Sequence, residues 1–252
     1  PVRTSPLYGR LKEQGAMFGW KLGWERPNWF APEGVEPRGV YTYGRQNWFP
    51  HVGAEHKACR ESVVLIDQTS FAKFLMVGKD AEAALSWICS NDVAVKPGRL
   101  VYTQMLNERG GIECDLTVSR LDDDTYYIVT GTGFATHDFS WIRRHIPDGL
   151  DARLIDITSA NGALSLMGPK ARDVLSAVTE ADVSNAAFPF GQHRELMIAG
   201  TPVRALRVTY VGELGWELHV PMDSLASVYD ALMKAGAPHG IRNAGYRAIE
   251  SL

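Results

Sequence analysis

The segment from Tyr102 to Val118 constrains the fold most strongly, because it reads as two strands joined by a tight turn. Gly110 and Gly111 form the turn, and adjacent glycines between alternating segments favour a hairpin with positive φ in its loop. Strand side chains point alternately to opposite faces, so the apolar residues of the second strand share one face: Ile112, Cys114, Leu116 and Val118. Asp115 then points to the other face. A solvated strand would show the same pattern, so the pattern alone assigns Asp115 no role.

The hairpin resembles the folate-binding core of the aminomethyltransferase family, which includes the T-protein of glycine cleavage. Tyr102, the sequence N-E-R-G-G-I at 107–112 and Asp115 before L-T-V carry this resemblance. The T-protein usually ends this motif with two adjacent acids, and here Cys114 replaces the first while Asp115 keeps the second. The resemblance implies that Asp115 is catalytic, because a carboxylate near the reacting nitrogens of tetrahydrofolate can accept or orient a proton. It implies that Tyr102 stacks on the folate or hydrogen-bonds to it.

Composition excludes some classes of partner. The chain has 252 residues, 45% hydrophobic and 22% charged, which is typical of one large or two modest globular domains. Its net charge of −3 argues against the basic surface of nucleic-acid-binding proteins. No apolar run is long enough for a membrane span, and residues 1–15 lack the apolar core of a secretory signal. We therefore expect neither a nucleic acid nor a membrane as partner.

The cysteines predict neither a metal site nor a disulfide framework. Cys59, Cys89 and Cys114 lack the spacing of metal ligands, and an odd number of cysteines fits buried free thiols in a reducing compartment. We expect the cytoplasm if the protein is bacterial and the mitochondrial matrix if it is eukaryotic.

Residues 1–50 differ in character from residues 51–252. A short helix is expected within 5–15, and the following stretch mixes Trp20, Trp24 and Trp29 with phenylalanine, glycine and proline. This mixture predicts an irregular arm, neither helix nor strand, which docks its aromatic rings on a neighbouring surface that the chain itself need not contain.

The arm also resembles a specific connector. The sequence from Gly15 to Phe30 follows the pattern G-x-x-F-G-x-K-x-G-W-E-R-P-N-W-F, which joins the flavin domain to the folate domain in sarcosine and dimethylglycine dehydrogenases. The resemblance implies a flavin domain that binds FAD and is covalently linked ahead of this chain. The chain lacks an initiator methionine and ends within a predicted helix, so we expect a piece of a longer polypeptide. In relatives a folate-holding arginine and a β-barrel domain follow.

From residue 51 the pattern is regular. A helix is predicted over 51–62 with Ala54, Ala58 and Cys59 as inner positions, and hairpins and helices alternate after it without a parallel βαβ repeat. We expect an α+β fold in which antiparallel sheets, in two related halves, are flanked by helices on one side. The T-protein's C-terminal β-barrel would be lacking, and a sub-boundary is possible near 147–153.

Four further residues join the predicted folate site through the resemblance. Asp67 matches a D-x-S or D-x-T element at the edge of the folate site, although a turn-forming or capping acid explains it equally well. Val129 is expected as an apolar wall, or simply as a core residue. Glu217 matches the second acid of R-x-x-Y-T-G-E-x-G-[FW]-E, which accepts hydrogen bonds from the pterin 2-amino and N3–H groups. Tyr210 is either a packing residue or a second contact to the ring, and Glu213 is expected to stabilise the turn.

The resemblances together imply one function and two alternatives. The implied function is to pass a methylene unit from the iminium of a small N-methylated amine to tetrahydrofolate, in a flavin-dependent demethylating dehydrogenase. One alternative is a regulatory module without turnover, like the regulatory subunit of pyruvate dehydrogenase phosphatase. The other is a standalone aminomethyltransferase. The sequence does not specify the amine or the oligomeric state.

Overall fold

The computed structural model describes residues 2–252, which form two compact units. The first unit contains residues 2–70, Gly162–Pro189 and Glu195–Leu252, and the second contains Phe71–Asn161 and Phe190–Arg194. The separation of residues 1–50 from 51–252 stays a prediction. The possible sub-boundary at 147–153 lies inside the second unit.

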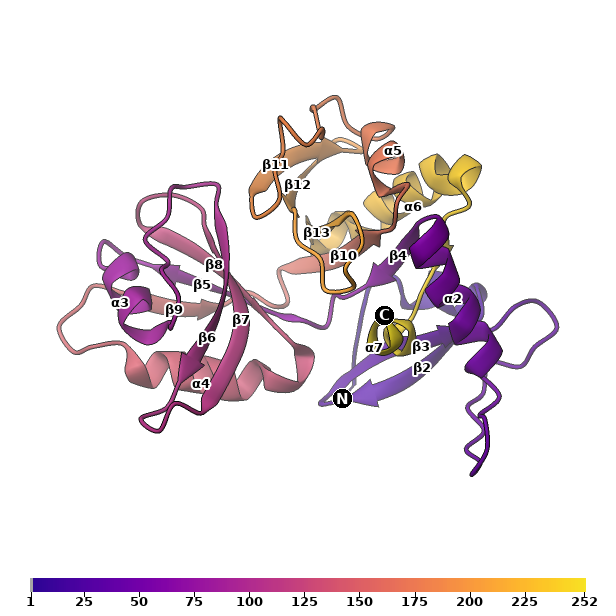
Figure 1. The fold of residues 1–252 in the computed structure, drawn as a ribbon, viewed down its shortest axis with the longest axis horizontal. Helices are drawn as coiled ribbons and strands as arrows, with labels where there is room; N and C mark the ends of the chain where they lie inside the picture. The colour runs from indigo at the N-terminus through magenta and orange to yellow at the C-terminus, as the bar shows by residue number, and fades with distance from the viewer. Residues whose placement is uncertain (1) are drawn as a thin grey trace. The chain divides into compact units, whose positions relative to one another are not determined.

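The second unit is a five-stranded sheet with two helices on one face (Figure 1). Its strands, in spatial order, are β6 (Leu100–Leu106), β7 (Ile112–Arg120), β8 (Thr125–Thr130), β5 (Ala72–Val77) and β9 (Arg153–Asp156), all paired antiparallel. The two helices are α3 (Ala81–Ile88) and α4 (Ala135–His145), and the short 3₁₀ segment η1 (Thr132–Phe134) directly precedes α4. Alternate residues of the strands, such as Phe74, Leu116 and Ile128, are buried against Leu85 of α3 and Ile142 of α4.

The predicted hairpin forms as β6 and β7. Gly110 has the positive φ, +77°, that the loop requires, and Cys114, Leu116 and Val118 are buried on the helix side. The placement of Ile112 on that face was wrong, because the register shifts between Met105 and Leu106 and leaves Ile112 66% exposed.

The first unit is built on a six-stranded sheet. Its strands, in spatial order, are β11 (His193–Ile198), β12 (Thr201–Leu206), β13 (Gly215–Pro221), β10 (Asn161–Met167), β4 (Val64–Asp67) and β14 (Arg242–Asn243). β12 pairs antiparallel with β13, and β10 pairs antiparallel with β4, whereas β14 pairs parallel with β4. Four helical segments accompany these strands: α5 (Ala171–Ser176), η2 (Met222–Ser224), α6 (Leu225–Gly236) and η3 (Ala237–His239). Leu164, Trp216 and Leu218 of the sheet form one core with Val174 of α5 and Leu232 of α6. The sequence patterns did not predict β11 and β14.

The aromatic arm is irregular only in part: residues 16–30 form two strands, so the prediction was wrong there, whereas residues 31–48 contain neither helix nor strand. The arm contains a small sheet of β1 (Arg3–Thr4), β3 (Trp24–Phe30) and β2 (Ala16–Lys21) in spatial order, and α1 (Tyr8–Glu13) lies between β1 and β2 in the sequence. Leu22 and Gly23 both have positive φ, which gives β2 and β3 the two-residue turn of a tight hairpin. Trp29 is buried beside Trp48, within the described chain. Trp20 is 67% exposed.

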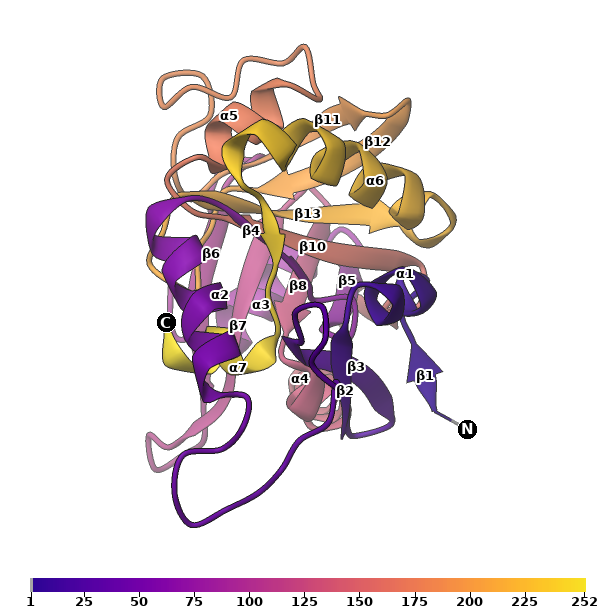
Figure 2. The same ribbon diagram turned by 90° about the vertical axis from the view of Figure 1, so that its right-hand side faces the viewer.

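Two helices complete the first unit and lie side by side next to β3 (Figure 2): α2 (Phe49–Glu61) and α7 (Tyr246–Ser251). On α2 the inner position is Glu55 rather than Ala54, which is exposed, while Cys59 is buried as predicted. Glu55 accepts N–H groups from Phe30 of β3 and from Gly245 at the start of α7. One carboxylate thus ties three segments together.

The α+β class with antiparallel sheets is confirmed. No helix within residues 2–252 combines the length and the apolar character that crossing a bilayer requires.

Candidate functional site

The six residues predicted for the folate site fall into two groups, one on each unit. The second unit carries Tyr102, Asp115 and Val129, and the first carries Asp67, Tyr210 and Glu217.

In the second unit, Tyr102 and Asp115 share the sheet face that the helices leave uncovered. Asp115 lies opposite Gln104, and Tyr102 lies opposite Thr117, so these four side chains form a cross-strand cluster on β6 and β7. Gln104 Nε2 donates to Asp115 Oδ1 at 3.1 Å. Both Tyr102, at 58%, and Asp115 are exposed. The hairpin therefore presents a phenol ring and a carboxylate together, with one carboxylate oxygen positioned by an amide.

Val129 continues this face toward the middle of the sheet. It pairs with Thr117 on one side and with Lys73 of β5 on the other, and both Val129 and Lys73 are buried. Val129 is therefore buried, as the wall of a ligand site would be. An ordinary core residue would be buried in the same way. Sequence reasoning missed Gln104 and Lys73, although the residue opposite Asp115 follows from the hairpin register once the turn is known.

In the first unit, Glu217 lies on β13 with its side chain only 14% exposed. Its Oε2 is 3.6 Å from Nε2 of His219, which is buried two residues further along the same face. The neighbouring histidine was not predicted, although the spacing of two in a strand indicates a shared face.

The turn before β13 carries two residues of the predicted motif, Glu213 and Tyr210, which have different surroundings. Arg60 of α2 forms an ion pair with Glu213, with Nη1 to Oε1 at 2.8 Å, and the same Nη1 donates to the carbonyl of Val211. Glu213 therefore stabilises the turn, as predicted. Tyr210, in the same turn, is an exposed side chain.

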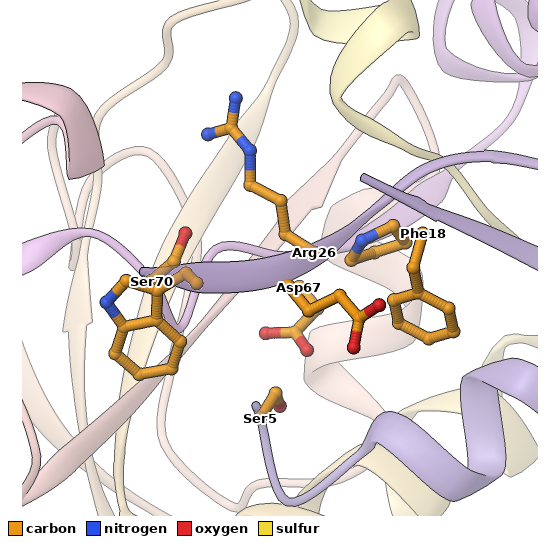
Figure 3. Close-up of a pocket in the computed structure, with 8 residues that line it drawn as sticks. Ser5, Phe18, Arg26, Asp67 and Ser70 are labelled. Atoms are coloured by element: carbon orange, nitrogen blue, oxygen red, sulfur yellow. The ribbon is translucent and has the colours of Figure 1, made fainter. Parts of the chain in front are cut away.

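Asp67 is the last residue of β4 and lines a small cavity of about 10 Å³ (Figure 3). Arg26, Ser70 and Phe18 line the same cavity. Asp67 Oδ1 accepts the N–H of Thr69 at 3.0 Å, which is the turn-forming role considered for it. The cavity has room for about one water molecule, so by itself it is far too small for a pterin ring.

Two residues of the cavity lining, Arg26 and Ser70, contact Tyr246. The guanidinium of Arg26 stacks over the ring of Tyr246 at 3.6 Å, and the Tyr246 hydroxyl shares a hydrogen bond of 3.0 Å with Ser70. Burial raises the pKa of Tyr246 to about 12, so this hydroxyl stays protonated at neutral pH. The Arg26 guanidinium thus lies on Tyr246 and points away from Asp67 (Figure 3).

A second hollow lies in the second unit, where a groove of about 530 Å³ runs between the end of α4 and β9. Pro147, Leu150, Leu154 and Arg153 are among its lining residues. Neither this groove nor the cavity at Asp67 is lined by Asp115 or Glu217.

Comparison with known proteins gives a consistent result. The family model described as the GCVT N-terminal domain matches residues 7–252. The chain is 42% identical to human mitochondrial sarcosine dehydrogenase over 289 residues, covering 100% of this chain and 32% of that protein. It is 37% identical to the mouse mitochondrial regulatory subunit of pyruvate dehydrogenase phosphatase, covering 100% of this chain and 29% of that protein. The chain thus spans about a third of the length of the curated relatives it matches.

A solved structure gives the same fold. The glycine cleavage system aminomethyltransferase T from Bartonella henselae superposes with a TM-score of 0.81 at 26% identity, covering 100% of this chain and 62% of that one. The hairpin motif, the match over nearly all residues and this shared fold agree. The chain therefore belongs to the aminomethyltransferase family, as a member that carries its GCVT N-terminal domain.

Proposed function

We propose that this chain is the folate-binding, one-carbon-transfer part of a flavin-dependent demethylating dehydrogenase of the sarcosine or dimethylglycine type. The observation that carries the proposal is the paired display of Asp115 and Tyr102 on one face of the glycine hairpin. The 42% identity to sarcosine dehydrogenase over the whole chain, arm included, supports the flavin-dependent type over a standalone aminomethyltransferase. FAD, in a domain joined to this chain, would supply the amine oxidation. The relatives' names favour the mitochondrial matrix in a eukaryote, and the cytoplasm remains the proposed compartment in a bacterium.

The residues of the hairpin suit a reduced folate. Tetrahydrofolate, when bound, supplies the nitrogens that take up the one-carbon unit. A phenol ring such as Tyr102 can stack on a planar heterocycle, and its neighbour Asp115 can accept an N–H from the same ligand. Gln104 holds one oxygen of Asp115 and so limits the rotation of the carboxylate.

Asp115 has two tasks in this proposal. Its carboxylate accepts or orients the proton that a nitrogen must lose when it forms a bond to carbon. Its negative charge also attracts the cationic iminium that brings the one-carbon unit, and this attraction is strongest where water is excluded. Asp115 is exposed in the described chain, so the bound folate and the joined domains would have to exclude water from it, which would also protect the iminium from hydrolysis to formaldehyde.

The residues of the first unit are proposed to bind rather than to react. Glu217 would accept the adjacent 2-amino and N3–H donors of a pterin, and its low exposure strengthens such charge-assisted hydrogen bonds. Tyr210 would add a ring contact and Asp67 a polar edge, while Val129 of the second unit would supply an apolar wall.

The role of Asp115 is tested by the fate of the methylene unit. In the polypeptide that joins this chain to its flavin domain, we expect Asp115→Ala to leave amine oxidation unchanged. Capture by tetrahydrofolate should fall by about 10²-fold or more, because a general base is lost. The measurement is the ratio of free formaldehyde to folate-bound product during turnover of sarcosine.

The matched control is Glu108→Ala, which removes an exposed acid from the loop of the same hairpin. Circular dichroism should show both variants folded, because neither side chain is buried. A normal partition between formaldehyde and folate product in Asp115→Ala would remove this residue from the mechanism.

The 37% identity to the phosphatase regulatory subunit favours one alternative, a module of this fold without turnover. Calorimetric titration with tetrahydrofolate separates the two cases at the level of binding. We expect saturable binding that Glu217→Gln weakens by about tenfold, since one charge-assisted hydrogen bond becomes a neutral one. Glu195→Gln, on β11 of the same sheet, serves as the control. Tight binding of tetrahydrofolate without any folate product would favour the regulatory module. If the joined polypeptide bound no tetrahydrofolate, the proposed one-carbon transfer and a folate-binding regulatory module would both be contradicted.

A further inference from the structure

The second unit holds a cluster of metal-binding side chains that the proposed folate chemistry does not use. One ligand atom each from Cys114, His137 and Asp138 lies within 4.8 Å of the other two. Cys114 projects from β7 toward the helices, and His137 and Asp138 belong to the first turn of α4. Cys114 and the adjacent residues His137 and Asp138 lie on different elements, which is why the spacing of the cysteines did not predict a metal site.

The carboxylate of the cluster is buried and fixed. Asp138 is 1% exposed, and its Oδ2 accepts a hydrogen bond of 2.6 Å from the hydroxyl of Thr130. Its Oδ1 lies 3.0 Å from Nδ1 of His137. One carboxylate oxygen is thus held by the end of β8, while the other faces the imidazole.

The imidazole is held from its other side as well. His137 Nε2 lies 3.4 Å from Oε2 of Glu113, and Oε1 of Glu113 accepts a hydrogen bond of 2.8 Å from the amide of Asn107. Histidines that bind metals in proteins characteristically donate their remaining N–H to a carboxylate, which fixes the tautomer and the ring orientation. Glu113 stands in that outer position for His137, and Thr130 does the same for Asp138.

We propose that Cys114, His137 and Asp138 form a binding site for Zn²⁺. The ligands would be the sulfur of Cys114, Nδ1 of His137 and Oδ1 of Asp138, with a solvent molecule in the fourth position. Sulfur, imidazole and carboxylate donors in this number are those of four-coordinate zinc sites with one open position. His137 is 46% exposed in its side chain, so the ion can enter from solvent on the side of the imidazole.

Binding requires a change of protonation at sulfur. Burial, together with the neighbouring Asp138 carboxylate, holds the pKa of the Cys114 thiol above its usual range, so the metal-free thiol is protonated. Coordination replaces the S–H bond with a sulfur–metal bond, and the proton passes to the buffer. The metal would link β7 to α4. It would lie on the face of β7 opposite Asp115, so it is not part of the proposed folate chemistry.

The test uses the purified full chain with Co²⁺ and Zn²⁺ as probes. We expect Co²⁺ to produce a thiolate-to-metal charge-transfer absorption with one ion per chain, and Zn²⁺ to displace it. Cys114→Ser should abolish this absorption. His137→Gln, at a half-exposed position that threatens the fold least, should weaken Zn²⁺ binding by more than about 100-fold. Glu113→Gln should weaken it by about 10- to 100-fold, as loss of an outer-shell partner does.

Two variants serve as controls. His145→Gln removes an exposed histidine at the far end of the same helix, and Cys59→Ala removes a buried thiol from the first unit. Both should keep the absorption and the affinity of the unmodified chain. The proposal is overturned if Co²⁺ gives no thiolate absorption, if Cys114→Ser keeps it, or if His137→Gln binds Zn²⁺ as tightly as His145→Gln. Thermal unfolding in the absence of metal confirms that each variant is folded.

Discussion

Glu55 is a buried carboxyl group whose protonation is coupled to the stability of the first unit. Burial raises its pKa from 4.5 to about 7, although the N–H groups of Gly245 and Phe30, and the charge of Arg242, act in the opposite direction. The folded state therefore holds this proton more tightly than the unfolded state does. The stability that comes from this difference is fully present below pH 4.5 and is lost as the pH rises through about 7.

We expect this dependence to appear in urea unfolding measured between pH 4.5 and pH 8. At about 1.4 kcal/mol per pKa unit, the shift corresponds to about 3 kcal/mol that the native chain loses over this interval. Glu55→Gln cannot ionise, so the free energy of unfolding of this variant should fall less with pH than that of the native chain. Glu61→Gln, at an exposed position of the same helix, should follow the native curve. Parallel curves for the native chain and Glu55→Gln would contradict the coupling.

The sequence predicted the position of Asp115 on its strand but not the buried position of Glu55 on its helix. Alternation along the second strand of the hairpin placed Asp115 on the face opposite Cys114, Leu116 and Val118, because alternation and the glycine turn are local properties. That Tyr102 lies on the same face as Asp115 follows only from the strand register of the structure. Glu55 was missed because a charged residue is not counted among apolar inner positions, although it lies four residues before Cys59 on the same helix face. Its partners, Phe30 and Gly245, are distant in sequence, so no local pattern could reveal the site. The folate roles of Asp115 and Glu217 stay predictions.

At the scale of elements, the arm shows why regular structure was overlooked. A two-residue turn is recognised in a sequence by Asn-Gly or Asp-Gly, whereas here Leu22 takes the left-handed conformation beside Gly23. Pro27 within β3 also argued against a strand, because proline cannot donate to a ladder. The structure accommodates Pro27 where the register between β2 and β3 is irregular.

The close approach of α7 to β3 is a second element-scale feature that no pattern predicted. A side chain at Gly245 would place its Cβ 2.3 Å from the backbone of Asn28, so only glycine permits this contact. The contact brings the backbone N–H of Gly245 to Glu55. The aromatic arm is thereby fastened to the last helix of the chain, and Arg247 adds a stacked contact, 3.7 Å from the ring centroid of Trp48.

For the whole molecule, the decisive property is that the two units have separate cores. Every buried residue of the first core lies in the first unit, and every buried residue of the second core lies in the second. Phe188 belongs to the first core and Phe74 to the second, and both are fully buried. A cavity destabilises mainly the core in which it opens, because the lost contacts are local.

Hydrogen exchange should therefore resolve the two cores as separate cooperative units. Phe74→Ala removes about 3–5 kcal/mol of packing from the second core, so we expect faster amide exchange throughout β5, β7 and β8. Exchange in β10 and β13 should change much less. Phe188→Ala is the matched variant and should give the reverse pattern, with faster exchange in β10 and β13. Mass spectrometry of peptides from both units, at one pH and temperature, provides the comparison. Equal acceleration in both sets of strands by either variant would mean that the cores unfold together, and the two units would then be one folding domain.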